Sequence, residues 1–101
     1  MGKYSRDKGK RGELDVKNRL GGSAQRTGHS FLAAPDVLTD FAAYSVKNKT
    51  VGGATILSEL RKLQGLAPGR NHYVVLKPER GVWIVAELLI QHVGDHGDEV
   101  V

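Results

Sequence analysis

The sequence predicts an α/β fold in which one mixed β-sheet is flanked by helices. Three observations support this: a charged segment that stops at Gly21-Gly22, apolar residues at helical spacing in residues 54–66, and short β-branched or aromatic runs between and after these segments. A chain of 101 residues has room for one hydrophobic core. We therefore expect a single domain over residues 1–94 and an acidic tail over residues 95–101.

The N-terminal half predicts a helix followed by three short strands. Ser5 or Asp7 is a suitable N-cap for a helix that ends near Leu20, where the glycine pair is a strong stop signal. The few apolar residues of this helix predict a narrow buried stripe. Further along, a polar tip separates two extended runs, which predicts a β-hairpin. The expected strands are residues 23–27, 36–38 and 41–47.

The C-terminal half predicts a second helix, a second hairpin and a short closing helix. Apolar residues at i, i+1, i+4 and i+7 are typical of an amphipathic helix, and Pro68-Gly69 ends it. Two runs of β-branched and aromatic residues follow, joined by the turn-forming residues 77–81. The expected elements are a helix over residues 54–66, strands over residues 72–76 and 82–85, and a closing helix over residues 86–93.

Charge and composition limit the possible classes of protein. All 15 Lys and Arg residues lie in residues 1–80 with seven acids, whereas residues 81–101 hold four acids and no Lys or Arg. The absence of cysteine excludes disulfide frameworks, zinc fingers and thiol nucleophiles. No apolar run approaches the roughly 20 residues of a membrane-spanning helix, and no apolar segment follows the charged N-terminus. We therefore expect a cytoplasmic protein with no membrane partner.

The N-terminal segment is strongly basic. Its first 19 residues carry seven Lys and Arg residues against three acids. This density of positive charge suits a polyanion such as nucleic acid. A terminus that only keeps the protein in solution explains the same charge equally well, so the basic run alone leaves both interpretations open.

The first predicted hairpin brings an acid and a lysine together. Side chains alternate along a strand, so Ala43, Ser45 and Lys47 share one face. Asp36 begins the neighbouring strand, and antiparallel pairing places it near the end that carries Lys47. Glu13 is available from the first helix. These residues form either a surface salt bridge or part of a catalytic site.

The chain resembles the PD-(D/E)XK nuclease superfamily, and in particular its archaeal-type Holliday junction resolvase branch. The features that carry the resemblance are Lys10-Arg11-Gly12-Glu13-Leu14 on the basic helix, Pro35-Asp36 on the hairpin and Ser45-Val46-Lys47 on the next strand. Their order matches the family over most of the chain. The resemblance implies a restriction-endonuclease-like fold and hydrolysis of DNA phosphodiester bonds, in a class of enzymes that acts in DNA recombination.

Carried over position by position, the resemblance implies a site for Mg²⁺, for which Mn²⁺ would substitute. Asp36 would ligate the metal, Glu13 would support the metal or its water, and Lys47 would position or polarise the attacking water. Mg²⁺ takes carboxylate oxygens and bridges to a phosphate oxygen, and a nearby ammonium stabilises the charge that develops there. The residues expected to contact DNA are Lys8, Lys10, Arg11, Arg26, Ser30 and Lys49.

One position departs from the family pattern. The acid expected two residues before the lysine is Ser45, whose hydroxyl is a poor substitute for a charged metal ligand. Three explanations remain open: the chain is a non-cleaving DNA binder, the serine is an engineered change, or the second carboxylate comes from elsewhere. Some restriction endonucleases of this superfamily combine Ser-X-Lys on the strand with a glutamate on the following helix.

Glu59 is the candidate for such a relocated acid. It follows Lys47 by 12 residues and lies on the amphipathic helix, about 100° from the apolar Leu60. This position is at the edge of the expected buried stripe. The alternative is a solvent-facing residue beside two basic neighbours. Asp40 is a poorer candidate because it lies at the hairpin tip and on the wrong face.

The residues and the resemblance together predict a Mg²⁺-dependent DNA endonuclease, most similar to a Holliday junction resolvase that acts as a homodimer on branched DNA. Its expected site combines Asp36, Glu59, Glu13 and Lys47, with the first three as metal ligands. The first alternative is a catalytically degenerate DNA-binding module of the same fold, marked by Ser45. The second is a small nicking or restriction-type nuclease that acts on ordinary duplex DNA.

Overall fold

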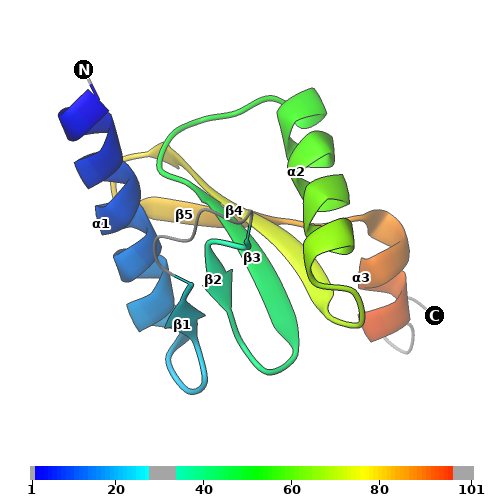
Figure 1. The fold of residues 1–101 in the computed structure, drawn as a ribbon. Coiled ribbons are helices and arrows are strands. Elements are labelled where there is room, and N and C mark those ends of the chain that lie inside the picture. The colour runs from blue at the N-terminus through cyan, green and yellow to red at the C-terminus, as the bar shows by residue number, and fades with distance from the viewer. Residues whose placement is uncertain (1, 28–33, 97–101) are drawn as a thin grey trace.

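The structure, a computed structural model, describes residues 2–27 and 34–96. A five-stranded mixed sheet lies between helices (Figure 1), which confirms the predicted α/β fold. The elements are α1 (Gly2–Leu20), β1 (Gln25–Arg26), β2 (Val37–Leu38), β3 (Ala42–Lys47), α2 (Gly53–Leu66), β4 (Asn71–Glu79), β5 (Val82–Ala86) and α3 (Leu89–His96).

The strands follow the order β1-β2-β3-β4-β5 across the sheet. All neighbouring pairs are antiparallel except β3 and β4, which run parallel. Parallel neighbours need a crossover connection, and α2 provides it. Both predicted hairpins are therefore confirmed, and α2 is placed directly after the strand that carries Lys47.

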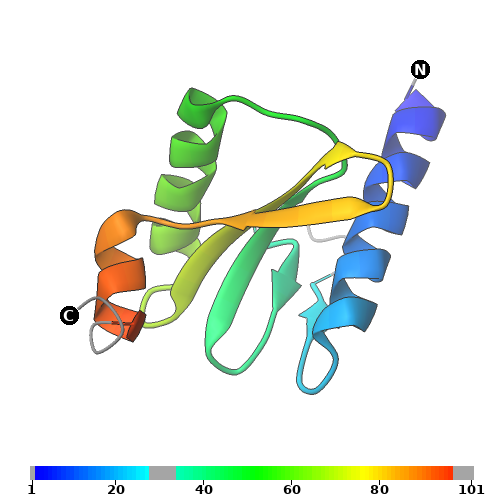
Figure 2. The same cartoon turned by 180° about the vertical axis from the view of Figure 1, so that it is seen from behind.

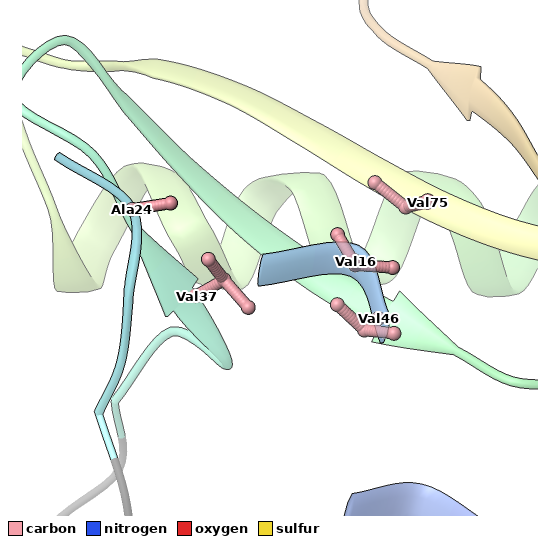
Figure 3. Close-up of a cluster of buried hydrophobic side chains, with 5 residues drawn as sticks. All are labelled: Val16, Ala24, Val37, Val46 and Val75. Carbon is pink, nitrogen blue, oxygen red and sulfur yellow. The ribbon is translucent and has the colours of Figure 1, made fainter. Parts of the chain in front are cut away.

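The helices α1 and α2 cover opposite faces of the sheet, as the two views of Figures 1 and 2 agree. On one face Val16 of α1 packs with Val37, Val46 and Val75 of the sheet and with Ala24, which precedes β1 (Figure 3). On the other face α2 contributes Leu60 and Leu63, which pack against Ala43, Val74 and Leu76. The alternation predicted for β3 is confirmed, because Val46 faces α1 while Ala43 faces α2.

The strand β4 is longer than predicted. It continues through Pro78 to Glu79, and its register with β5 shifts between Leu76 and Glu79. Such an irregularity is where a strand tolerates proline, which has no N–H to donate. The turn between the strands is therefore only Arg80-Gly81, shorter than predicted. Gly81 adopts a φ of +82°, a backbone conformation that residues with a Cβ rarely adopt.

The closing helix was predicted too early in the chain. Ala86 belongs to β5, where it pairs with Val74, so α3 begins only at Leu89. The helix then continues through Gly94 to His96, and residues 95 and 96 are thus helical rather than part of the predicted tail. Residues 97–101 lie outside the described residues.

Exposed apolar side chains gather on β5 and α3. Ile84 is 45% exposed and Val85 59% exposed, although they point to opposite faces of β5. In α3, Leu89 and Ile90 are more exposed still. The sheet therefore ends in a strand that the helices leave partly uncovered on both faces. Across the described residues, no helix has the length and apolar character needed to cross a membrane.

Candidate functional site

The hairpin of β2 and β3 sets Asp36 opposite Ser45. Val37 pairs with Tyr44 in an antiparallel register. Asp36, which precedes Val37, therefore lies across from Ser45, which follows Tyr44. The backbone N–H of Asp36 donates to the Tyr44 carbonyl at 2.9 Å. In return, the backbone N–H of Val46 donates to Asp36 Oδ2 at 2.8 Å, which fixes the carboxylate against the strand.

Glu59 reaches the same place from α2. Its Oε1 lies 2.8 Å from Lys47 Nζ, and its Oε2 accepts a hydrogen bond of 3.3 Å from Ser45 Oγ. Lys62, one turn further along the helix, places Nζ 3.5 Å from the same Oε2. Glu59 is therefore turned toward the sheet rather than to solvent, as its place at the edge of the apolar stripe predicts.

These side chains line a hollow of about 110 Å³ between the hairpin and α2, large enough for several water molecules. Its polar wall comes from two acids, two lysines and one serine, and its apolar wall from two leucines of α2. The residues are Ala34, Pro35, Asp36, Ser45, Lys47, Glu59, Lys62, Leu63 and Leu66. Lys62 is one of the two basic neighbours of Glu59 in the sequence, and its i,i+3 spacing from that acid is a usable signal of the contact.

The pKa values of the two acids of the hollow, Asp36 and Glu59, are shifted in opposite directions. Burial raises the pKa of Asp36, and the nearby Glu59 charge raises it further, against the hydrogen bond from Val46 and the charge of Lys47. Burial would raise the pKa of Glu59 as well, but the hydrogen bond and charge of Lys47, aided by Lys62 and Ser45, hold it below its ordinary value. The hollow thus holds one well-compensated carboxylate and one poorly compensated carboxylate.

Glu13 approaches from α1 and does not line the hollow. Its Oε2 lies 3.8 Å from Arg26 Nη2. Burial raises the pKa of Glu13, and the negative charge of Asp36 raises it further. The two carboxylates therefore repel each other. Arg26 turns its guanidinium toward Glu13, and Ser30 lies outside the described residues.

Three of the residues expected to contact DNA lie together. Lys8, Arg11 and Lys49 line one groove beyond the end of β3. Lys10 is exposed and does not line that groove. Two further cations of the groove, Lys77 and Arg80, come from the β4–β5 hairpin, where the sequence predicts only a turn.

The donor set of the hollow fits a divalent cation. No group of three or more His, Asp or Glu side chains suited to a metal ion occurs among the described residues. Mg²⁺, however, commonly uses one or two carboxylates and fills its remaining positions with water and substrate phosphate. Asp36 and Glu59 supply two carboxylates whose charges repel each other, and a cation between them would remove that repulsion.

Comparison with protein-family models, with curated proteins and with solved structures gives no match for this chain. The resemblance to the PD-(D/E)XK superfamily therefore rests on the residues and their order along the chain.

Proposed function

We propose that this protein is a metal-dependent DNA endonuclease that hydrolyses phosphodiester bonds, most similar to a Holliday junction resolvase. The observation that carries the proposal is the place of Glu59, whose carboxylate contacts both Ser45 and Lys47. A PD-(D/E)XK site needs a second carboxylate beside the lysine of this strand. Glu59 supplies one from α2, in the same hollow as Asp36.

The residues of the hollow divide the work of phosphodiester hydrolysis among them. Asp36 and Glu59 would hold Mg²⁺ or Mn²⁺, which when bound polarises a phosphate oxygen and lowers the pKa of a water. Ser45 orients Glu59 through its hydrogen bond, and the Val46 N–H orients Asp36.

Lys47 lies within contact distance of Glu59, so its ammonium is close to any group that this carboxylate binds. There it would orient the attacking water and stabilise charge that develops on the phosphate. The protein would therefore supply two ligands from two elements and one electrostatic catalyst from the strand between them.

A second candidate is a DNA-binding module of the same fold that does not cleave. The ion-pair network favours it, because Lys47 and Lys62 both contact Glu59 and together compensate its charge without any metal. In that case the network would be structural. Asp36 argues against this alternative, since a partly buried acid with a raised pKa is a cost that a purely structural hairpin does not need.

We also propose that the protein acts as a homodimer through β5 and α3. In the described sheet β5 is the last strand, and it exposes apolar side chains on both faces next to the apolar Leu89 and Ile90. We expect a second copy of the chain to cover this apolar surface, because two identical edge strands can pair antiparallel about a two-fold axis. Cutting two matched strands of a junction also requires two copies of the site.

The test is a cleavage assay on a four-way junction, linear duplex and single-stranded DNA, with Mg²⁺, with Mn²⁺ and with EDTA. We expect metal-dependent cleavage of the junction, lost in Asp36→Asn and reduced by orders of magnitude in Lys47→Ala. Asp40→Asn is the matched control, because Asp40 is an exposed acid at the tip of the same hairpin. Metal-independent cleavage, or full activity of Asp36→Asn, would refute the proposed site; DNA binding without cleavage would support the module.

A further inference from the structure

The molecule carries a second hollowed region, a groove of about 660 Å³ beyond the end of β3. Three segments that are distant in the sequence form it: the N-terminal half of α1, residues 48–50 and the β4–β5 hairpin. Figure 2 shows the turn of that hairpin beside the N-terminal half of α1. The groove is lined by five cations, Lys8, Arg11, Lys49, Lys77 and Arg80, and by one acid, Glu79.

The walls of the groove are joined by contacts that leave the charged groups available. Asn48 Nδ2 donates to the Lys8 carbonyl at 3.0 Å, and Thr50 Oγ1 donates to the Pro78 carbonyl at 3.2 Å. The absence of a side chain at Gly12 permits the approach, since a Cβ there would lie 2.9 Å from the Asn48 Cβ. Uncharged side chains and backbone carbonyls therefore fix the spacing of the walls.

The cations of the groove have two acids near them: Glu79 lines the groove, and the charge of Lys77 acts on Asp15. Among the side chains that the structure describes, residues 8–27 and 34–94, none of the five takes part in an ion pair. Lys77 instead places its Nζ 5.1 Å from the centre of the Trp83 ring, and Trp83 Nε1 donates to Asp15 Oδ2 at 2.7 Å. Five like charges around one groove repel each other unless an anion binds between them.

Among the described residues, the groove and the hollow share no lining residue, but residues that line them are neighbours along the chain. Asn48 and Lys49 follow Lys47 without a gap, and two residues of extended chain span at most about 7 Å. The backbone that forms one wall of the groove therefore begins within about 7 Å of Lys47, which lines the hollow. A single phosphate would occupy a small part of a groove of this size, whereas a phosphodiester backbone presents a series of phosphates.

We propose that this groove holds the sugar-phosphate backbone of DNA next to the strand that is cut, with the β4–β5 hairpin as its second wall. The inference rests on the proposed function for the identity of the polyanion, and it assigns Lys77 and Arg80 to substrate binding. Each cation that neutralises a phosphate releases a counterion, so each makes binding more sensitive to salt.

The experiment measures binding of fluorescent duplex and junction DNA by anisotropy over a range of salt, in EDTA so that no cleavage occurs. The double variant Lys77→Gln/Arg80→Gln should weaken binding on the order of tenfold for each lost contact at about 0.1 M salt, and lower the log–log slope by up to about 0.9 per contact. The control Arg61→Gln/Arg70→Gln removes the same charge from exposed positions outside the groove.

Two further variants separate charge from folding. Lys77→Arg keeps the charge and the contact with Trp83, so it should bind as the unmodified protein does. Arg80→Gln alone changes only the exposed turn and should lower the slope by one contact. An unchanged slope in the double variant, or an equal loss in the control, would overturn the inference while leaving the nuclease proposal intact. If the unmodified protein binds no DNA, the proposed function fails as well.

Discussion

Ser45 and Glu59 are separated by 14 positions in the chain and joined by a hydrogen bond of 3.3 Å between Oγ and Oε2. The serine is 4% exposed and lies on β3, opposite Asp36, whereas the glutamate descends from α2. The carboxylate of Glu59 thus occupies the space that an acidic side chain at position 45 would fill. A strand serine and a helix glutamate together place one carboxylate beside Lys47.

Asp36 is expected to reduce stability when it ionises. Its pKa in the folded protein is raised above the ordinary 3.8, mainly by burial, so the native state favours the protonated form. Stability is then lost as the pH rises through the folded pKa. Asn at this position stays neutral and can still accept the Val46 N–H. Asp36→Asn should therefore have a higher Tm than the unmodified protein at about pH 7 in EDTA, and the difference should vanish below about pH 3.

Glu59 provides the control of opposite sign. Its pKa lies below the ordinary 4.5, because Lys47, Lys62 and Ser45 outweigh burial, so its ionised form stabilises the fold above that value and the contribution is lost in acid. Glu59→Gln should lower stability at about pH 7 by on the order of 1 kcal/mol, or roughly 4–8 °C in Tm. Thermal unfolding followed by circular dichroism across pH measures both variants. Equal losses in the two would contradict the assignment.

Divalent metal should reverse the cost of ionised Asp36. A cation that binds only the native state stabilises it by about 1.4 kcal/mol when its concentration is ten times its Kd. Mg²⁺ or Mn²⁺ should therefore raise the Tm of the unmodified protein and of Asp40→Asn, but not that of Asp36→Asn or Glu59→Gln. A shift of the same size in all four proteins would place the metal elsewhere.

Most of the fold follows from local patterns, because the sheet faces are set by a period of two and α2 by a period near 3.6. Glu59 could be predicted for the same reason, since its place at the edge of the apolar stripe fixes the direction of its side chain. The groove could not be predicted from the sequence, because Lys77 and Arg80 lie near Lys8 only once the β4–β5 hairpin and α1 have packed together in the folded protein. The start of α3 was misplaced because Ala86 is held in β5 by Val74, which no local signal records.

A charge on the edge strand should separate the proposed dimer. Ile84→Lys places an ammonium on β5 where its side chain is 45% exposed, and edge lysines oppose strand pairing between chains. Sedimentation velocity should give a dimer for the unmodified protein and a monomer for Ile84→Lys. Phe41→Lys is the control, because Phe41 is also exposed but lies before β3, the middle strand of the sheet, rather than on the edge strand β5. A monomeric unmodified protein would contradict the dimer.

The exchange of the acid between helix and strand is the sharpest test of the site. Glu59→Ala should abolish metal-dependent cleavage as completely as Asp36→Asn, because the metal loses one of its two carboxylates. Ser45→Ala should have a mild effect, since it removes only the hydrogen bond that orients Glu59. Normal cleavage by Glu59→Ala would end the relocation hypothesis.

The effects of Ser45→Glu and Glu59→Ala on stability and on cleavage should be strongly non-additive when the two changes are combined. Ser45→Glu alone places a second carboxylate against Glu59 in a buried position, which costs stability through like charge and crowding. Glu59→Ala then vacates that space, so the double variant Ser45→Glu/Glu59→Ala should be more stable than Ser45→Glu. It should also regain part of the cleavage lost in Glu59→Ala, because the new carboxylate shares a face of β3 with Lys47. Activity in Ser45→Glu but not in the unmodified protein would identify a disabled nuclease, since the helix acid would then have failed to replace the strand acid.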